Sequence, residues 1–486
     1  MLDALHAARD WLDALPHIKS WLIGAWLAYL AGLGVWIVLQ KREPAATLSW
    51  LLSLAALPYI GFLIYFLLGP QKIKRQRLRR GHARSGMETF TSVCAPDVDC
   101  TELARLGQAV TGLPATTATE VRWLEDGSAT YAALLGDIAK ARRQVHLEYY
   151  IFADDRTGRQ LRDALVERAS AGVMVKVLVD AVGSSTLHAS FFAPLVAAGG
   201  EFAWFHPTRL RLFTRPWVNL RCHRKIAIID GHIGYTGGIN VTDDENDALR
   251  DDAYRDLHMR LEGDIVRSLQ LVFVEDWVYA TGQKPGTFHV MDTWPAGVPK
   301  RGDGHIQAQA LVSGPDTSWE AIHRMHVAAI HEARQRVWLV TPYFVPGEAA
   351  RMALTSAALG GLDVRLLVPR MSDSRMVTLA ARSYYEELLA AGVRVFEYGP
   401  RMLHTKALLT DDDLCLVGSA NFDQRSFRLN FELSVMLRDA RVVQALAQHL
   451  QGEMSASREV TTAGPGRALL RKRLPEAFAR LLSPLL

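Results

Sequence analysis

A repeat that covers most of the chain limits the possible folds more than any other feature of the sequence. Three segments of the first half recur in the same order in the second half, at offsets of 192, 189 and 193 residues. Matches in one order at a nearly constant offset indicate that a single unit has been duplicated. The matching segments are residues 145–152 with 337–344, 172–179 with 361–368, and 198–207 with 391–400.

Each copy alternates short β-branched runs with amphipathic stretches, which is the pattern of strands and helices in an α/β sheet. We therefore predict an α/β body of two homologous halves, residues 110–285 and 300–455, joined by a linker rich in Gly and Pro over residues 282–304. Apolar residues make up 49% of the 486 residues and charged residues 22%, which excludes a disordered chain. The net charge of +4 points to no particular class of partner.

Residues 1–84 have the composition of a membrane anchor. Residues 21–39 and 45–69 are uncharged and strongly apolar, and about 20 such residues are enough for a helix to cross the hydrocarbon core of a bilayer. We predict a hairpin of two transmembrane helices. Two buried helices of a soluble core are a weaker alternative, because soluble helices rarely stay uncharged for so long. A cleavable signal peptide is disfavoured, because two runs occur in tandem without a convincing cleavage site.

Charged residues beside these runs predict how the hairpin is oriented. Residues 71–84 contain seven basic residues and no acidic one, which by the positive-inside rule places this segment in the cytoplasm. The same segment either also binds anionic lipid headgroups or serves only as a topology signal. At the other end of the chain, residues 464–486 form a basic, amphipathic tail that suggests a second, interfacial helix.

The repeat also contains a set of polar residues that is present twice without a gap. Both copies fit the pattern H-x-K-x4-D-x6-G-[GS]-x-N. A single H-x-K-x4-D is common by chance, but two copies with the same tail, inside a sequence repeat, are a specific signal. The first copy consists of His223, Lys225, Asp230, Gly238 and Asn240, and the second of His404, Lys406, Asp411, Ser419 and Asn421.

These residue types suit chemistry at a phosphodiester. Residues two apart in a strand point to the same face, so the His and Lys of each copy project together. One neutral imidazole can attack phosphorus and form a covalent intermediate, while the second protonates the departing alkoxide and later deprotonates the incoming alcohol. The lysines, the asparagines and the small Gly238 and Ser419 positions can hold the phosphate oxygens. No metal or cofactor is required, and the sequence contains no zinc-type ligand cluster.

The paired motif resembles that of the phospholipase D superfamily, in which two such motifs meet at one site between two halves. Further segments resemble the bacterial cardiolipin synthases within it, and this resemblance extends nearly from end to end. They are the two-span leader from Arg42 to Gly69, Asn219–Lys225, Tyr254-Arg-Asp256, and Asn421–Glu432. The resemblance implies a duplicated phospholipase D-type sandwich with one shared active site, in a multi-pass protein of the bacterial inner membrane with a cytoplasmic body.

The resemblance also implies a reaction. Such enzymes join two phosphatidylglycerols and release glycerol, through a phosphohistidine. By analogy His223 is the nucleophile and His404 the acid and base, although the sequence alone cannot order them. Asp230 and Asp411 either orient the chemistry or cap a strand turn. Carboxylates in two of the quoted segments, Asp256 and Glu432, are either partners of the catalytic residues or exposed strand-end groups.

Several alternatives stay open at this point. A phospholipase D that hydrolyses its lipid would use the same residues, with water as the acceptor. A nuclease is disfavoured by the apolar N-terminal runs and by the lack of a basic, aromatic-rich groove, so no nucleic-acid partner is expected. A scaffold with a decayed site is disfavoured because all six His, Lys and Asp residues are present. The oligomeric state and the acyl-chain preference are not predicted.

Three smaller features complete the sequence-based expectations. Residues 208–220 are an insertion in the first half that mixes arginines with apolar residues, and they are either a lipid-access element or an ordinary surface loop. Cys94 and Cys100 lie in an expected loop, and a disulfide between them is disfavoured. Cys222 and Cys415 lie in strand-like runs, where we expect them to be buried and to act as small apolar residues.

Overall fold

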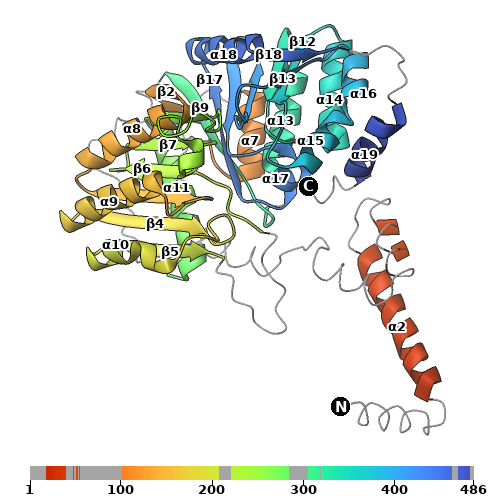
Figure 1. Ribbon diagram of the computed structural model, residues 1–486, viewed down its shortest axis with the longest axis horizontal. Helices are drawn as coiled ribbons and strands as arrows, with labels where there is room; N and C mark the ends of the chain where they lie inside the picture. Colours follow the sequence, from red (N-terminus) through yellow and green to blue (C-terminus); the bar gives the residue numbers. More distant parts are fainter. Residues whose placement is uncertain are drawn as a thin grey trace. The chain divides into compact units, whose positions relative to one another are not determined.

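A computed structural model describes nine stretches of the chain. They are residues 18–39, 47–48, 51–52, 54, 101–206, 220–283, 305–317, 319–461 and 469–481. The chain divides into two compact units, one formed by residues 1–72 with 210–216 and the other by the remaining residues. The first contains the N-terminal helix and the second contains the whole α/β body (Figure 1).

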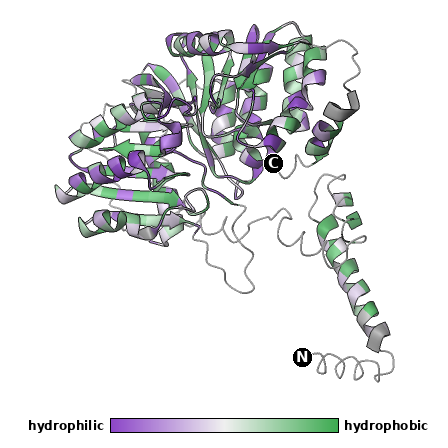
Figure 2. Cartoon of the chain, viewed as in Figure 1, coloured by the Kyte–Doolittle hydropathy of each residue, from purple (hydrophilic) through white to green (hydrophobic). Residues whose placement is uncertain are grey.

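The N-terminal unit contains helix α2 (Ile18–Val38), which is apolar along nearly its whole length (Figure 2). Large apolar side chains of this helix are exposed, among them Trp21, with 75% of its surface accessible, and Ile23, with 61%. Among the described residues, no helix combines the length and the apolar character needed to cross a bilayer. The structure therefore does not support the transmembrane span predicted at residues 21–39.

Other sequence-based predictions fall outside the described residues. This applies to nearly all of the second predicted span, to the basic run at 71–84, to all but the last residue of the insertion at 208–220, and to Cys94 and Cys100. Most of the predicted linker, residues 284–304, also lies there.

The first half of the body is built around a seven-stranded sheet. Its strand order is β2-β8-β7-β6-β3-β4-β5, with β3, β4 and β5 parallel to one another and the rest antiparallel. The strands are β2 (Glu120–Glu125), β3 (Gln144–Tyr149), β4 (Met174–Asp180), β5 (Glu201–Phe205), β6 (Ile226–Ile229), β7 (Ile233–Gly237) and β8 (Leu257–Glu262). Its helices are α8 (Asp126–Lys140), α9 (Arg156–Ser170), α10 (Ala193–Ala197) and α11 (Ile265–Thr281).

The second half is built around a nine-stranded sheet of order β1-β9-β17-β15-β14-β10-β12-β13-β18. Its strands are β1 (Thr116–Ala118), β9 (Ile306–Ser313), β10 (Arg336–Val340), β12 (Asp363–Pro369), β13 (Arg394–Tyr398), β14 (Ala407–Thr410), β15 (Leu414–Gly418), β17 (Glu432–Arg438) and β18 (Ser457–Val460). A separate parallel pair joins β11 (Phe344–Val345) to β16 (Phe422–Asp423). The helices are α7 (Glu102–Thr111), α13 (Ala321–Glu332), α14 (Glu348–Leu359), α15 (Arg375–Arg382), α16 (Tyr385–Ala390), α17 (Gln424–Arg428), α18 (Ala440–Ser455) and α19 (Leu469–Leu481).

The two sheets have the same internal order, which confirms the predicted duplication of an α/β unit. The series β2-β8-β7-β6-β3-β4-β5 corresponds strand for strand to β9-β17-β15-β14-β10-β12-β13. The nine-stranded sheet has an additional strand at each edge. One of them, β1, precedes the first sheet in the chain but pairs with β9 of the second. The chain therefore crosses between the halves before the first half begins.

The core explains why these strands form. Runs such as Ile226–Ile229 and Ala407–Thr410 are buried on both faces, as expected for central strands covered by helices on each side. One apolar cluster joins α11 and α18 to the facing sides of both sheets, while two others fill the outer sides of the sheets. The strands accordingly stand out as apolar in Figure 2. The core thus fixes the two sheets relative to each other, and with them the ends of their central strands.

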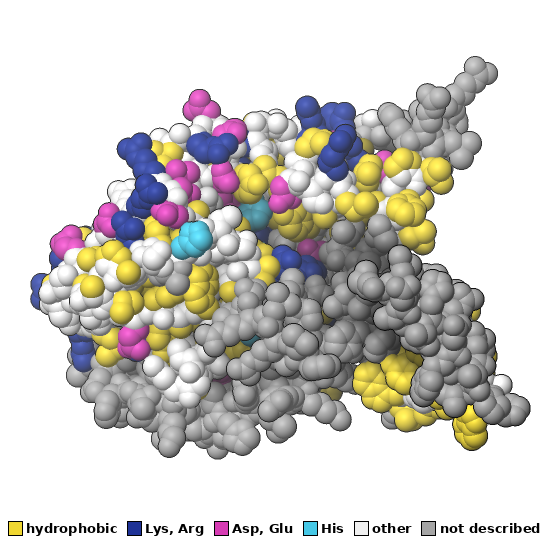
Figure 3. Space-filling view, turned by 60° about the horizontal axis from the view of Figure 1, so that its bottom comes forward, with side chains coloured by type: hydrophobic (Ala, Val, Ile, Leu, Met, Phe, Trp, Pro, Cys, Tyr) yellow, Lys and Arg dark blue, Asp and Glu magenta, His cyan; other side chains and the backbone are white. Residues whose placement is uncertain are grey.

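Charge is mixed on the described part of the surface that Figure 3 shows. Lys and Arg side chains are interspersed there with Asp and Glu. A nucleic-acid groove would instead gather basic side chains on one face. This face therefore offers no support for the nuclease alternative.

Candidate active site

A cavity of about 620 Å³ lies where the two histidine motifs meet. Both halves contribute to its wall, and most of the residues that line it have polar side chains. The lining comprises Tyr150, Ile151, Arg221, His223, Asn240, Thr242, Asp244, Glu245, Tyr254, Tyr343, Val345, Asp373, Ser374, Val377, His404, Asn421, Asp423, Arg425 and Asn430. The two motif histidines and the two motif asparagines predicted from the sequence are therefore brought together in one cavity.

Backbone pairing between the halves positions the two histidines. The amide of His223 donates to the carbonyl of Phe431 over 2.9 Å, and the amide of Phe431 donates to the carbonyl of Arg221 over 2.8 Å. The second motif repeats this arrangement. The amide of His404 donates to the carbonyl of Arg255 over 2.7 Å, and the amide of Arg255 donates to Met402 over 2.8 Å. The segment before each motif histidine thus forms a short parallel β-bridge with a segment of the opposite half.

The residues that follow these bridging positions supply the carboxylate partners of the histidines. His223 Nδ1 lies 3.1 Å from a carboxylate oxygen of Glu432, and His404 Nδ1 lies 2.7 Å from one of Asp256. Both carboxylates are almost completely buried. An Nδ1–H that donates to a carboxylate leaves the lone pair on Nε2, which is the form of imidazole that can act as nucleophile or base. The alternative that Asp256 and Glu432 are exposed strand-end groups is therefore wrong.

The difference between Gly238 and Ser419 follows from these carboxylates. A Cβ atom at Gly238 would lie 2.2 Å from an Asp256 oxygen, so only glycine fits there. In the second motif the Ser419 hydroxyl donates to Glu432 instead. Neither residue lines the cavity. Both residues lie against the carboxylates that orient the histidines. Their predicted substrate-binding role stays a prediction.

The two motif lysines lie beneath the histidines rather than in the cavity wall. Lys225 Nζ donates to the carbonyl of His223 over 2.8 Å, and Lys406 donates to the carbonyl of His404. Lys406 also lies 3.5 Å from Asp256. Both lysines are almost completely buried. Their charges therefore act on the cavity from below, through a medium that screens them weakly.

Burial and neighbouring charges determine the protonation of this group. Burial lowers the pKa of His223 to about 4; the Lys225 ammonium adds to this shift and Glu432 opposes it. Burial and the nearby Lys406 ammonium also lower the pKa of Lys225 to about 8. Burial acts to raise the pKa of Glu432, but His223 and Lys225 keep it below its usual value. At neutral pH the structure therefore holds a neutral His223 beside an anionic Glu432.

The two asparagines have different surroundings. Asn240 is fully engaged, because its Nδ2 donates to Glu245 over 2.6 Å and its Oδ1 accepts from the amide of Ile151. The Oδ1 atom of Asn421 is buried and has no hydrogen-bond partner among the described residues. Both line the cavity. Asn421 therefore has spare hydrogen-bonding capacity in the cavity, whereas Asn240 holds Glu245 in place.

Comparison with known proteins identifies the family. A family profile described as "Cardiolipin synthase, PLD-like domain" matches residues 134–277 and 327–454, and one described as "Phospholipase_D-nuclease N-terminal" matches residues 21–70. Over 469 residues, the chain is 38% identical to "Cardiolipin synthase 2" of Bacillus anthracis, covering 93% of this chain and 89% of the relative. This chain belongs to the cardiolipin synthase family of phospholipase D-like proteins.

Further relatives agree with this assignment and confirm the resemblance noted in the sequence. The chain is 36% identical over 490 residues to "Cardiolipin synthase" of Geobacillus thermodenitrificans, covering 98% of this chain and 95% of the relative. Among solved structures, phosphatidylserine synthase from Haemophilus influenzae matches with a TM-score of 0.59 at 15% identity, over 79% of this chain and all of that one. That similarity shows the fold alone, and it agrees with the duplicated α/β body.

Two residues of the family motif, Asp230 and Asp411, lie away from the cavity. The Asp230 carboxylate accepts from the amides of residues 142, 143 and 144, at 2.8–3.2 Å. Asp411 accepts in the same way from residues 334, 335 and 336. Both have a left-handed backbone with φ of 52°. These contacts favour the second alternative from the sequence, that each aspartate caps a strand turn. A catalytic role of the two aspartates stays a prediction.

Sequence reasoning assigned no role to several side chains in the cavity of this family member. The Tyr150 ring packs edge-on against His223, with centroids 4.8 Å apart, and its hydroxyl accepts from Arg221 over 2.9 Å. The ring of Tyr254 lies 5.5 Å from that of His404. Arg425 and Asp373 also line the cavity. Arg221, Tyr254 and Arg425 occur in the segments that carry the family resemblance. Their place in those segments is the only feature of the sequence that could have pointed to them.

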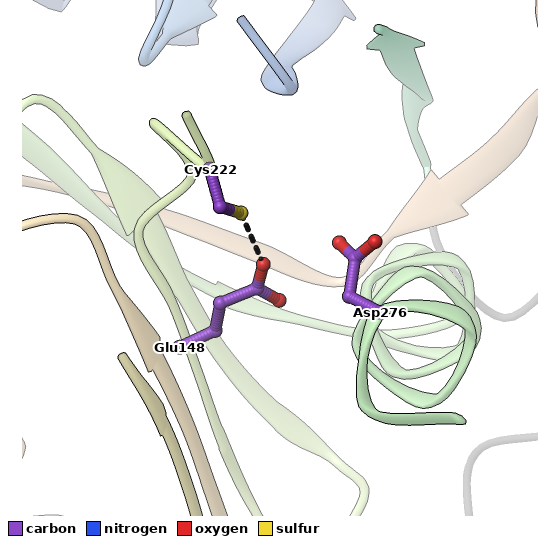
Figure 4. Close-up of side chains that lie close together, drawn as sticks. All are labelled: Glu148, Cys222 and Asp276. Atoms are coloured by element: carbon purple, nitrogen blue, oxygen red, sulfur yellow. Dashed lines mark hydrogen bonds between the residues drawn. The ribbon is translucent and has the colours of Figure 1, made fainter. Parts of the chain in front are cut away.

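Two groups of side chains have the types and spacing that could hold a metal ion. They are Glu148, Cys222 and Asp276, and Glu245, Asp256 and His404, with ligand atoms within 4.8 Å of one another. Figure 4 shows the first group, in which the Cys222 thiol donates to Glu148 over 2.7 Å. A cationic side chain already contacts each group, Arg224 at Asp276 and Lys406 at Asp256. Both groups therefore belong to buried charge networks, the first beside His223 and the second including His404 itself.

The cysteines that the structure describes agree partly with the prediction. Cys415 is buried within β15, as expected of a small apolar residue. Cys222 is also buried, but its thiol hydrogen-bonds a carboxylate and its amide donates to Asp180 over 2.7 Å. These contacts of Cys222 therefore help to hold the backbone next to His223, a role beyond that of filling space.

The capping role of Asp230 can be separated from catalysis by substitution. Asp230→Ala removes an acceptor of three amides and leaves alanine in a left-handed backbone, so we expect a loss of about 2 kcal/mol in the free energy of unfolding. Asp230→Asn keeps one acceptor oxygen and tolerates that backbone, so its loss should be smaller. Denaturant unfolding measures both, with the exposed Asp412→Ala as control. Lipid turnover lost by Asp230→Asn at unchanged stability would contradict the capping role.

The lowered pKa of Lys225 predicts the alkaline limit of activity. Lys225 is cationic below pH 8 and loses its charge above it, so kcat/KM should fall with an apparent pKa of about 8. Lys225→Arg keeps the charge at all these pH values and should move the limb to higher pH, at a reduced maximum rate. The measurement is kcat/KM for lipid turnover between pH 5 and 10. An alkaline limb that stays in place in the arginine variant would rule out Lys225 as its source.

Proposed function

We propose that this protein transfers a phosphatidyl group from one phosphatidylglycerol to another, giving cardiolipin and glycerol through a phosphohistidine. One observation carries the proposal. Two histidines face one cavity, and each is held through Nδ1 by a buried carboxylate of the opposite half. The family membership of the chain supports the same reaction. The proposed enzyme class is therefore a phosphatidyltransferase.

The first step forms the covalent intermediate. His223 is neutral at physiological pH, so its Nε2 lone pair can attack the phosphorus of the donor lipid. The new P–N bond replaces the bond between phosphorus and the glycerol headgroup oxygen. His404 enters this step as an imidazolium whose Nδ1–H is held by Asp256. It gives its Nε2 proton to that oxygen, and glycerol leaves. His223 as nucleophile is supported by its low pKa and by its contact with the anionic Glu432.

The second step reverses the roles of proton donor and acceptor. A terminal hydroxyl of the second phosphatidylglycerol gives its proton to His404, and its oxygen attacks phosphorus. The P–N bond breaks and returns the electron pair to His223. Two phosphatidylglycerols are thus converted to one cardiolipin and one glycerol, without a change in oxidation state. The site then returns to its starting protonation state.

Charges around the cavity support the transition state. The two lysines beneath the histidines place two positive charges near the phosphate oxygens. Asn421 lines the cavity, where its Nδ2–H groups can donate to a phosphate oxygen, whereas Asn240 acts by holding Glu245. A phospholipase D that transfers the lipid to water would use the same groups. The family relationship favours transfer to a lipid alcohol.

The same proposal includes attachment to the membrane. The exposed apolar side chains of α2 suit contact with lipid, and α19 presents Leu474, Phe478 and Leu481 at helical spacing, all more than half exposed. Ala479 of α19 packs against Val377, which lines the cavity. Contact with a bilayer does not require that α2 crosses it. The two-span hairpin, the division into an anchor and two halves, and a cytoplasmic body at the inner membrane stay predictions.

The reaction is tested by its products. Purified enzyme in phosphatidylglycerol vesicles should give cardiolipin and free glycerol in a ratio of one to one. His223→Ala and His404→Ala should each lower the rate at least about 1000-fold, because a nucleophile or a proton carrier is lost. The exposed His331→Ala is the matched control. Phosphatidic acid without cardiolipin would identify a hydrolase instead.

The order of the histidines is tested with donor lipid labelled in its phosphate. After a quench in denaturing detergent at alkaline pH, which preserves the acid-labile P–N bond, label should remain on the protein in His404→Ala, in which the intermediate forms slowly and is not passed on to an alcohol. Label should be absent in His223→Ala. The opposite pattern would make His404 the nucleophile.

Membrane attachment is tested by flotation with phosphatidylglycerol vesicles. The triple variant Ile23→Glu, Leu27→Glu, Val35→Glu should float less than the parent, because three charges now face the lipid. Leu359→Glu, an equally exposed apolar position in α14, is the control. Equal flotation of the triple variant and the parent would show that α2 does not contribute to attachment.

A further inference from the structure

The catalytic groups of the two halves are arranged alike, but the cavity wall around them is not. The two motifs align at an offset of 181 residues, the distance from His223 to His404. At this offset Arg221 corresponds to Met402, and Arg425 corresponds to Asp244. Arg221, Arg425 and Asp244 all line the cavity. Neither cavity arginine therefore has a basic residue at the corresponding position of the other half.

The arginines belong to one group with Tyr150 and His223. Arg221 donates to the Tyr150 hydroxyl, and the Tyr150 ring packs against His223. Arg221 forms no ion pair with any carboxylate in the described part of the chain. Burial lowers the pKa of Arg425, and the neighbouring Arg221 guanidinium adds to that effect. Two guanidinium groups that face one cavity and repel each other are stabilised when an anion binds between them.

We propose that Arg221 and Arg425 bind the phosphate of the acceptor lipid, beside the reacting phosphate that the two histidines address. This inference rests on the proposed function. It adds a second anion subsite to the cavity and assigns it to the phosphodiester of an incoming phosphatidylglycerol. Guanidinium groups suit such a ligand, because their paired N–H donors match two oxygens of one phosphate.

The chemistry of the acceptor explains the need for this subsite. Water and phosphatidylglycerol both offer a hydroxyl, but only the lipid also has an anionic phosphate, three carbons from that hydroxyl. A cavity of about 620 Å³ can hold both phosphates and the glycerol between them. Cations that hold the second phosphate raise the local concentration of the lipid hydroxyl over that of water. The arginine pair thereby favours transfer over hydrolysis.

The test compares an anionic acceptor with a neutral one in the same reaction. Vesicles of phosphatidylglycerol with added ethanol yield cardiolipin from the lipid acceptor and phosphatidylethanol from the alcohol. Arg221→Gln and Arg425→Gln should each lower the ratio of cardiolipin to phosphatidylethanol by about tenfold or more, since a charged hydrogen-bond donor to the acceptor phosphate is lost. Arg425→Lys keeps the charge and should restore part of the ratio. The control is Arg394→Gln, at an exposed position paired with Glu459.

The outcomes separate this inference from the proposed function. Unchanged amounts of both products in both glutamine variants would overturn the inference, because the arginines would then act on neither lipid. An equal loss of both products would also overturn it, because the arginines would then act on the donor. Cardiolipin formation by the parent protein tests the proposed function itself, and its absence would overturn both. Melting temperatures of the variants, measured alongside, exclude a loss caused by unfolding, and the ratio does not depend on the amount of active enzyme.

Discussion

The exchange of carboxylates between the two halves is the interaction on which the site depends. Glu432 of the second half holds His223 of the first, and Asp256 of the first half holds His404 of the second. Neither half therefore contains a complete catalytic unit. The backbone bridges at Phe431 and Arg255 place each carboxylate next to the opposite motif. Duplication of the fold created two similar sheets, and the docking of their strand ends created one site.

This arrangement places many charges where water is scarce. Lys225, Lys406, Asp256 and Glu432 are all almost completely buried, and each is close to a group of opposite charge. Removing one member of such a network leaves its partner as an uncompensated buried charge, which costs about 3–5 kcal/mol. The site is thus tied to the stability of the docked halves. The same low dielectric strengthens the attraction between the lysines and a bound phosphate.

Much of this could be predicted from the sequence, because the signals were local or repeated. The repeat predicted two similar sheets, and the His-x-Lys spacing placed each pair in front of a buried strand. The role of Asp230 could not be decided, because fixed spacing to a histidine shows membership of a motif and not the direction of a side chain. Glu432 could not be assigned to His223, because the two are 209 residues apart and meet only through the docking of the halves. Nearly all of the insertion at 208–220 and of the second predicted span lies outside the described residues, so those predictions are untested.

A symmetric site formed by duplication cannot by itself distinguish the two lipid substrates. Two equivalent halves would treat the two lipids alike, yet the reaction needs one lipid as donor and the other as acceptor. In this chain the histidines and lysines keep the symmetry, because attack on phosphorus and proton transfer to oxygen occur on opposite sides of one phosphate. The two asparagines differ in their contacts. The cavity wall does not keep this symmetry, since Arg425 corresponds to Asp244 and Arg221 to Met402. Asymmetry confined to the wall can distinguish the two substrates while the pair of histidines serves both steps.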